Sequence, residues 1–201
     1  MTSTPASERQ LSDRERLIAL LANRSAKRGD FVLASGRRSS LYVDCRLTTM
    51  SPDGQLLIGR EALLALRDTG WPIDAVGGLT LGADPVSYAI AHASALAAEA
   101  GDGRPMLRAF TVRKEAKAHG TGRLIEGPFA EGDRVVVVED VITTGGSALK
   151  ATESLRAAGA HVLGVLALVD REEGGREALE AAGLQVISLV RAAQLVELLP
   201  A

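Results

Sequence analysis

The chain contains very little cysteine and few aromatic residues, and each shortage narrows the class of protein. Among 201 residues there is one cysteine, Cys45, so no disulfide can form within the chain. A protein without disulfides is typical of a reducing compartment such as the cytoplasm. Aromatic residues make up 3% of the chain, whereas 46% of it is hydrophobic. We therefore expect a substantial core, filled mainly by alanine, leucine and valine.

Long apolar runs and a surplus of positive charge are missing as well. No stretch approaches the ~20 apolar residues that a membrane-spanning helix needs. The first ten residues lack the apolar segment of a signal peptide. The formal net charge is -2, whereas proteins that bind nucleic acid generally carry an excess of lysine and arginine. We expect a cytoplasmic protein that binds neither membranes nor nucleic acid.

The order of apolar and amphipathic segments predicts a single α/β domain, 1–201, in which 1–11 form a flexible tail. Short apolar runs alternate with helical segments, which is typical of βαβ units in a parallel sheet covered on both faces. Helices are expected at 12–28, 52–68, 84–98, 146–158 and 175–182. Strands are expected at 73–79, 106–112, 134–140, 161–170 and 184–190.

The stretch VVVVEDVITTGGSALKA, 135–151, places two acids and a small, hydroxyl-rich turn after an apolar strand. In open α/β sheets, ligands bind beyond the carboxyl ends of the strands, where amides of the next helix point outward. Gly145 and Gly146 allow an anion to approach the backbone. Two carboxylates would repel a phosphate, so Glu139 and Asp140 suit the hydroxyls of a ribose. The stretch thus predicts a ribose 5-phosphate site, although an acid pair in solvent before an ordinary turn would also produce this pattern.

The same residues resemble the phosphoribosyl-pyrophosphate (PRPP) motif of the type I phosphoribosyltransferases. The resemblance implies the type I phosphoribosyltransferase fold: an α/β domain whose central, mostly parallel sheet is flanked by helices, with a small hood built from the N-terminal and C-terminal segments. It also implies that the two acids hold the ribose hydroxyls and that the turn binds the 5-phosphate. The PRPP-binding residues implied here are Glu139, Asp140, Val141, Ile142, Thr143, Thr144, Gly145, Gly146 and Ser147.

A second stretch, VRKEAKAHGTGRLIEG at 112–127, concentrates basic residues, and its part 114–127 shows no apolar periodicity of a helix or strand. Taken alone, it could be a solvated basic loop. Phosphoribosyl transfer, however, builds negative charge on the departing pyrophosphate and requires that water be excluded, and a mobile cationic lid does both. The stretch resembles the loop of the orotate phosphoribosyltransferases, which carry the pattern R-K-x-x-K-x-H. The matching residues are Arg113, Lys114, Lys117 and His119.

This resemblance implies that the four basic residues bind PRPP and that Lys117, His119 and Asp140 are catalytic. It also implies a homodimer in which Lys114 and other loop residues reach the site of the neighbouring subunit. Such a dimer rests on the resemblance alone, because no interface pattern is visible in the sequence.

Two further segments resemble the parts of the family that bind the orotate base. FVLASGRRSSLYVDCR, 31–46, resembles the family's N-terminal orotate segment, which implies that Tyr42 and Val43 line the base pocket. Arg171 follows an apolar strand where the family uses an arginine for the orotate carboxylate. A guanidinium suits a carboxylate because it donates two parallel hydrogen bonds. Thr143 is implied to contact the base as well.

GGLTLGADPV, 77–86, matches the family's pyrophosphate loop, so the backbone around Thr80 and Leu81 is expected to face the diphosphate. Two residues depart from the family pattern. Ala34 stands where some members have a lysine, and no PRPP contact is assigned there. Glu139 stands where many members have aspartate, and its longer side chain would shift the ribose contact slightly.

The resemblance implies transfer of the 5-phosphoribosyl group from PRPP to orotate, giving orotidine 5′-monophosphate and pyrophosphate in pyrimidine biosynthesis. Mg²⁺ is the expected cofactor, held mainly by substrate oxygens and water, as that ion prefers. One alternative is a type I enzyme for a purine base, which would need no arginine for a base carboxylate. Another is a PRPP-sensing regulator that binds nucleic acid, which would require a basic face or an added DNA-binding module.

Overall fold

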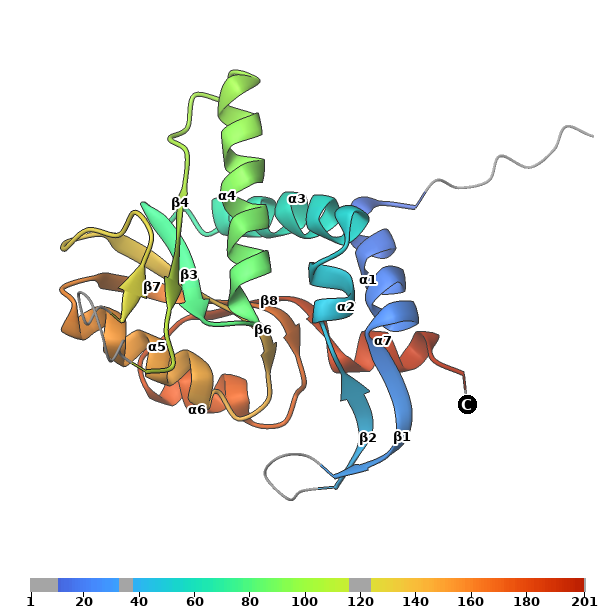
Figure 1. The fold of residues 1–201 in the computed structure, drawn as a ribbon. Coiled ribbons are helices and arrows are strands. Elements are labelled where there is room, and N and C mark those ends of the chain that lie inside the picture. Colours follow the sequence, from blue (N-terminus) through green and yellow to red (C-terminus); the bar gives the residue numbers. More distant parts are fainter. Residues whose placement is uncertain (1–10, 33–37, 116–123, 201) are drawn as a thin grey trace, which may run out of the picture.

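A six-stranded sheet forms the centre of the fold (Figure 1). The computed structural model describes residues 11–32, 38–115 and 124–200. The strands are β3 (Ala75–Leu79), β4 (Arg108–Val112), β5 (Ile125–Glu126), β6 (Arg134–Ile142), β7 (His161–Asp170) and β8 (Val186–Arg191). They lie in the order β5-β4-β3-β6-β7-β8, and only the β4–β5 pair is antiparallel. The mostly parallel sheet expected from the sequence is confirmed.

Helices cover both faces of this sheet, and the four consecutive valines of β6 show how. Val136 and Val138 pack in one core cluster with α1 (Asp13–Arg24), α3 (Pro52–Asp68), α4 (Ala83–Glu99) and α7 (Ala192–Leu198). Val135 and Val137 pack in a second cluster with α5 (Gly146–Ala157) and α6 (Gly175–Ala181). Successive side chains of a strand point to opposite faces, so an unbroken apolar run is what a doubly covered strand requires. Burying each valine contributes about 1.5–3 kcal/mol.

The first helix ends earlier than its apolar spacing predicted. It begins as expected at a capping box, in which Glu15 donates its backbone N–H to the Ser12 hydroxyl and accepts the Ser12 N–H. It ends at Arg24 rather than near residue 28. The reason is tertiary: the Ser25 hydroxyl is hydrogen-bonded to the Thr48 hydroxyl at 2.8 Å, and the Ser25 carbonyl accepts the Asp44 N–H.

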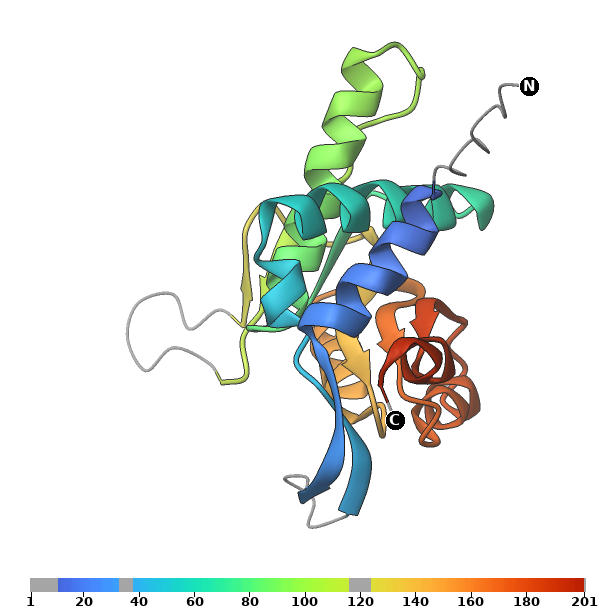
Figure 2. The same ribbon diagram turned by 90° about the vertical axis from the view of Figure 1, so that its right-hand side faces the viewer.

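After that turn, β1 (Ala26–Val32) and β2 (Arg38–Val43) form an antiparallel hairpin that the sequence did not predict. The hairpin projects from the body of the fold at the end of α1 (Figure 2). Arg28 ties it to the C-terminal helix by donating to the Val196 carbonyl at 2.9 Å. Together with the short helix α2 (Arg46–Thr49) and with α7, the hairpin forms the expected N-terminal and C-terminal hood.

The other expected helices and strands are present, with bounds that differ from the expected ones by at most two residues. In the described part of the chain, none of the helices combines the length and apolarity needed to cross a bilayer. The expected tail lies almost wholly outside the described residues. Assignment of the whole chain to one domain stays a prediction.

Helix α7 offers a matched test of the packing. Leu195 is fully buried in the first core cluster, whereas Leu198 on the same helix is 56% exposed. Leu195→Ala should lower the free energy of unfolding by about 2–5 kcal/mol, because it removes buried methyl groups and leaves a cavity. Leu198→Ala should change it by less than about 0.5 kcal/mol. Urea denaturation followed by circular dichroism measures both, and equal effects would show that α7 does not pack in this way.

Candidate active site

A cavity of about 390 Å³ opens at the carboxyl ends of β3 and β6 and reaches the end of β7. Carboxyl ends of parallel strands meet at one edge of the sheet, which is why segments distant in sequence converge here. Eleven of the expected site residues line the cavity. They are Tyr42, Val43, Thr80, Leu81, Lys114, Glu139, Asp140, Val141, Thr143, Ser147 and Arg171.

The expected pyrophosphate loop runs directly against the acid pair. A Cβ added at Gly82 would collide with the carboxylate of Asp140, and one added at Gly78 would collide with the Val138 carbonyl oxygen. Side chains at these two positions would therefore push β3 and its loop away from β6. The two glycines therefore allow the pyrophosphate loop and the acid pair to form adjoining walls of one cavity.

The two acids are buried side by side. Glu139 is 8% exposed, and its Oε2 has no hydrogen-bond partner among the described residues. Burial, and then the charge of Asp140, raises the pKa of Glu139 well above its ordinary value. Burial also raises the pKa of Asp140, opposed by hydrogen bonds from Glu139 and from the Val141 N–H. Burial thus disfavours the charged form of both acids.

The turn after β6 has the geometry that anion binding requires. Gly145 has φ = 79° and precedes α5, and a Cβ there would press on the Gly175 carbonyl. Only glycine adopts this backbone conformation without strain. The first amides of α5 have no intrahelical acceptor and point toward the turn. Thr143 and Ser147 line the cavity, whereas Thr144, Gly145 and Gly146 do not.

Ile142 was expected among the PRPP-binding residues, but its side chain belongs to the second core cluster and is 1% exposed. Its carbonyl oxygen accepts the Arg171 N–H at 2.9 Å and so fixes the start of the segment after β7. Any contact between Ile142 and PRPP would have to use the backbone, and that role stays a prediction.

The two ends of the basic loop are held by backbone contacts. Arg113 donates its N–H to the Leu124 carbonyl at 2.8 Å, and its guanidinium forms an ion pair with Glu126 at 3.6 Å, away from the cavity lining. Lys150 of α5 donates to the Lys114 carbonyl at 2.9 Å. The Lys114 side chain lines the cavity of its own chain, where its charge lowers the pKa of Glu139. Lys117 and His119, both expected to be catalytic, lie outside the described residues, as does Ala34.

Arg171 is buried at the wall of the cavity. Its Nη2 lies within 2.9 Å of the Ser39 hydroxyl and the Leu41 carbonyl, both in β2, and 2.6 Å from Glu173. Its Nε is buried and has no acceptor among the described residues. Arg171 lines the cavity together with Tyr42 and Thr143.

Sequence reasoning missed three polar residues that line the cavity: Asp44, Cys45 and Arg46. Asp44 accepts two hydrogen bonds from the Arg46 guanidinium, at 2.8 and 2.9 Å, and the positive charge of Arg46 lowers the pKa of Asp140. Burial, followed by the charge of Asp140, raises the pKa of the Cys45 thiol well above its ordinary value, so this cysteine is no nucleophile. The signal in the sequence was their place at the end of the segment 31–46, which resembles the family's orotate segment, although only Tyr42 and Val43 were assigned there.

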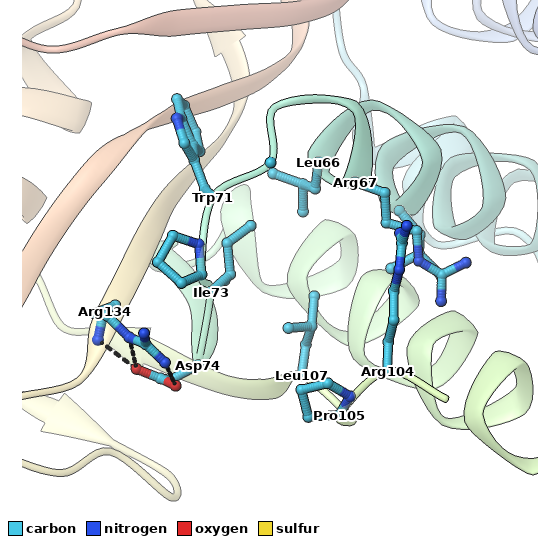
Figure 3. A pocket seen from close by; sticks show the side chains of 12 residues that line it. Leu66, Arg67, Trp71, Ile73, Asp74, Arg104, Pro105, Leu107 and Arg134 are labelled. Atoms are coloured by element: carbon cyan, nitrogen blue, oxygen red, sulfur yellow. Dashed lines mark hydrogen bonds and ion pairs between the residues drawn. The ribbon is translucent and has the colours of Figure 1, made fainter. Parts of the chain in front are cut away.

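A second cavity, of about 410 Å³, lies near the amino ends of the strands (Figure 3). Trp71, Ile73 and Leu107 form apolar walls, and Arg134 on its rim is ion-paired with Asp74. None of the expected site residues lines it. Although it is slightly larger, it has neither the acid pair nor the turn, and the cavity at the carboxyl ends is the candidate active site.

Among the described residues, no three His, Cys, Asp or Glu side chains are grouped so that they could hold a metal ion. The carboxylates nearest one another in the cavity are those of Glu139 and Asp140. A pair of this kind suits an ion that takes one or two carboxylates together with substrate oxygens and water, which is how Mg²⁺ is usually bound.

Comparison with known proteins gives consistent results. A family model described as "Phosphoribosyl transferase domain" matches residues 85–188. The orotate phosphoribosyltransferase of Aquifex aeolicus is 47% identical over 186 residues, which cover 91% of this chain and 97% of that protein. That of Sorangium cellulosum is 49% identical, covering 89% of this chain and 90% of that protein.

Solved structures agree with these relatives. Mycobacterium tuberculosis H37Rv orotate phosphoribosyltransferase in complex with PRPP superposes with a TM-score of 0.74 at 42% identity, covering 92% of this chain and 99% of that one. The adenine phosphoribosyltransferase of Leishmania tarentolae gives a TM-score of 0.60 at 18% identity, covering 94% and 93%, a likeness of fold alone.

The raised pKa of Glu139 has a measurable consequence for stability. A carboxyl group with a raised pKa in the folded state contributes stability at low pH, and this contribution is lost as the pH rises from about 4.5 through the raised value. Glu139→Gln keeps the shape and cannot ionise. The free energy of unfolding of the variant, relative to that of the wild type, should therefore increase as the pH rises above about 4.5.

Urea denaturation at several pH values measures this difference. Glu153→Gln, at an exposed position on α5, is the matched control and should show no such trend. A difference between Glu139→Gln and wild type that stays constant across the pH range would mean that Glu139 is ionised throughout.

Proposed function

The chain belongs to the orotate phosphoribosyltransferase family, and we propose that its cavity carries out that family's reaction with Mg²⁺ and as a homodimer. The enzyme transfers the 5-phosphoribosyl group from PRPP to orotate, which yields orotidine 5′-monophosphate and pyrophosphate in pyrimidine biosynthesis. The observation that carries the assignment of roles is one cavity in which the acid pair, the turn before α5 and Arg171 converge.

Binding of PRPP is divided among three walls of the cavity. The turn with Thr143 and Ser147 takes the 5-phosphate through hydroxyls and the first amides of α5. The acid pair takes the ribose hydroxyls. The loop containing Thr80 and Leu81 takes the diphosphate. Each group of the substrate thus meets donors or acceptors of matching character.

Orotate is held by its carboxylate. Arg171 supplies the donors, and the three acceptors around its Nη2 fix the plane of the guanidinium before the base arrives. A guanidinium that is already held in place loses little side-chain entropy on binding. Tyr42, Val43 and Thr143 border the same space and complete the base pocket.

Catalysis on this arrangement is electrostatic. As the bond from C1 of the ribose to pyrophosphate breaks, positive charge develops on the sugar next to Asp140, whose carboxylate stabilises it. Negative charge develops on the departing pyrophosphate. The basic loop stabilises this charge through Lys114, Lys117 and His119. No step requires a protein nucleophile, in keeping with the protonated thiol of Cys45.

Mg²⁺ fits this donor set at the acid pair, with substrate oxygens and water as its remaining ligands. When bound, the ion would neutralise charge on the diphosphate oxygens.

The cytoplasmic location stays a prediction, supported by the single cysteine.

The homodimer is supported by an apolar groove between α3 and α4. Leu56 and Leu64 of α3 and Leu96 of α4 are exposed and line a groove of about 650 Å³. In Figure 1 the carboxyl-terminal part of α4 stands clear of the body of the fold. Apolar surface of this kind on two packed helices is typical of a protein interface, and we place the second copy of the chain there.

The reaction itself is tested with purified protein, Mg²⁺ and PRPP. Loss of orotate absorbance should be rapid, whereas adenine, hypoxanthine, xanthine and uracil should release little pyrophosphate. Arg171→Gln should raise the KM for orotate by at least about 10-fold, because a buried charge-assisted pair is lost, and should leave the KM for PRPP nearly unchanged. Turnover of another base in place of orotate would contradict the assignment of Arg171.

The same assay tests the metal. Chelation of Mg²⁺ with EDTA should abolish turnover, and added Mg²⁺ should restore it. Undiminished turnover in EDTA would remove Mg²⁺ from the proposal and leave the protein residues to neutralise the diphosphate.

Exchange of subunits tests whether the basic loop serves the neighbouring site. Lys114→Ala and Asp140→Asn should each be nearly inactive alone. If Lys114 acts on the partner, half of the dimers in an equal mixture are hybrids, and each hybrid has one complete site. Activity should then reappear, to about a quarter of the wild-type value after full exchange. If hybrid dimers form, as native mass spectrometry can show, and no activity returns, Lys114 acts in its own chain.

A further inference from the structure

Asp84 is a buried carboxylate that the PRPP motif does not include. It lies in the first turn of α4 and is 8% exposed. Its Oδ2 accepts the Thr80 hydroxyl at 2.7 Å, and its Oδ1 accepts the Thr111 hydroxyl at 2.8 Å. Each carboxylate oxygen therefore serves one hydroxyl, and the pyrophosphate loop is joined to β4 through this side chain.

These bonds decide which atoms of the loop can reach a substrate. The hydroxyl proton of Thr80 is directed at Asp84, and the Thr80 N–H donates to the Val112 carbonyl at 2.8 Å. Both donors of Thr80 are thus committed inside the protein. The N–H groups of Leu81 and Gly82 have no acceptor among the described residues, and both residues line the active-site cavity.

The Asp84 carboxylate also holds β4, the strand that leads into the basic loop. Thr111 lies on β4 two residues before Arg113, and its hydroxyl is also 3.1 Å from the Tyr88 hydroxyl of α4. One buried group thereby fixes the pyrophosphate loop relative to the strand that leads into the basic loop. Hydrogen bonds to a charged acceptor are roughly twice as strong as neutral ones, which makes Asp84 effective in this place.

We propose that Asp84 is a positioning residue for the diphosphate of PRPP: by binding the Thr80 hydroxyl, it holds the Leu81 and Gly82 amides toward the cavity as the donors of the loop. The inference deepens the proposed function, because it rests on the placement of the diphosphate at this loop. It assigns the Thr80 hydroxyl an indirect role and the two amides the direct one.

A double-mutant cycle separates the two roles. Thr80→Val removes the hydroxyl and keeps the shape, and Asp84→Asn removes the charge and one acceptor. Each should raise the KM for PRPP and the inhibition constant of pyrophosphate by roughly 10-fold, with the KM for orotate within about 2-fold of wild type. The double variant should be no worse than the poorer single variant, because both changes break one link.

Thr111→Val is the matched control, since it breaks the other bond of Asp84 and leaves the bond to Thr80. It should raise the KM for PRPP less than Asp84→Asn does. Thermal unfolding of every variant separates a loss of fold from a loss of binding. If Asp84→Asn does not fold, Thr80→Val alone still tests the inference, because its KM for PRPP should rise while its KM for orotate stays close to that of the wild type.

Two results would overturn the inference. Losses that add in the double variant would mean that the Thr80 hydroxyl binds the diphosphate directly. Unchanged PRPP and pyrophosphate constants in Thr80→Val and Asp84→Asn would mean that the link does not position the loop. In either case, normal orotate turnover by the wild-type protein would leave the proposed function standing.

Discussion

The active site depends on the close approach of β3 to β6. Gly78 and Gly82 leave no side chain between these strands and their loops, and a methyl group at either position would meet the Val138 carbonyl or the Asp140 carboxylate. Interiors are packed too densely to absorb such an intrusion without moving the backbone. The contact at Gly78 is with backbone and the contact at Gly82 is with a side chain, and together they allow the pyrophosphate loop to lie close to the acid pair.

That close approach also creates the electrostatic character of the cavity. Burial raises the pKa of Glu139 and of Asp140, whereas the neighbouring Arg46 lowers that of Asp140. Burial thus makes it costly for both acids to carry a full charge at the same time. A single negative charge beside the sugar can stabilise a cationic transition state without strongly repelling a substrate that itself carries several negative charges.

Local patterns predicted the parts of the fold and site that are built from adjacent residues. The run 135–151 contains its strand, turn and helix in order, so its placement followed from periodicity and turn chemistry. The β1–β2 hairpin and α7 were missed because their burial comes from partners distant in the sequence: most residues of β1 are exposed and show no clear alternation. Arg46 ends the segment 31–46 that resembles the orotate segment, but its effect on Asp140 depends on a strand almost a hundred residues away and could not be predicted from that segment.

Helix α5 connects the phosphate site with the basic loop. Its first turn receives the 5-phosphate in the proposed mode, and Lys150, about one turn further along, donates to the carbonyl oxygen at the root of the loop. A rigid helix transmits a tilt at one end to every group along it. The turn proposed for the 5-phosphate and the anchor of the basic loop therefore lie on one rigid element, so a substitution that displaces α5 would disturb both at once.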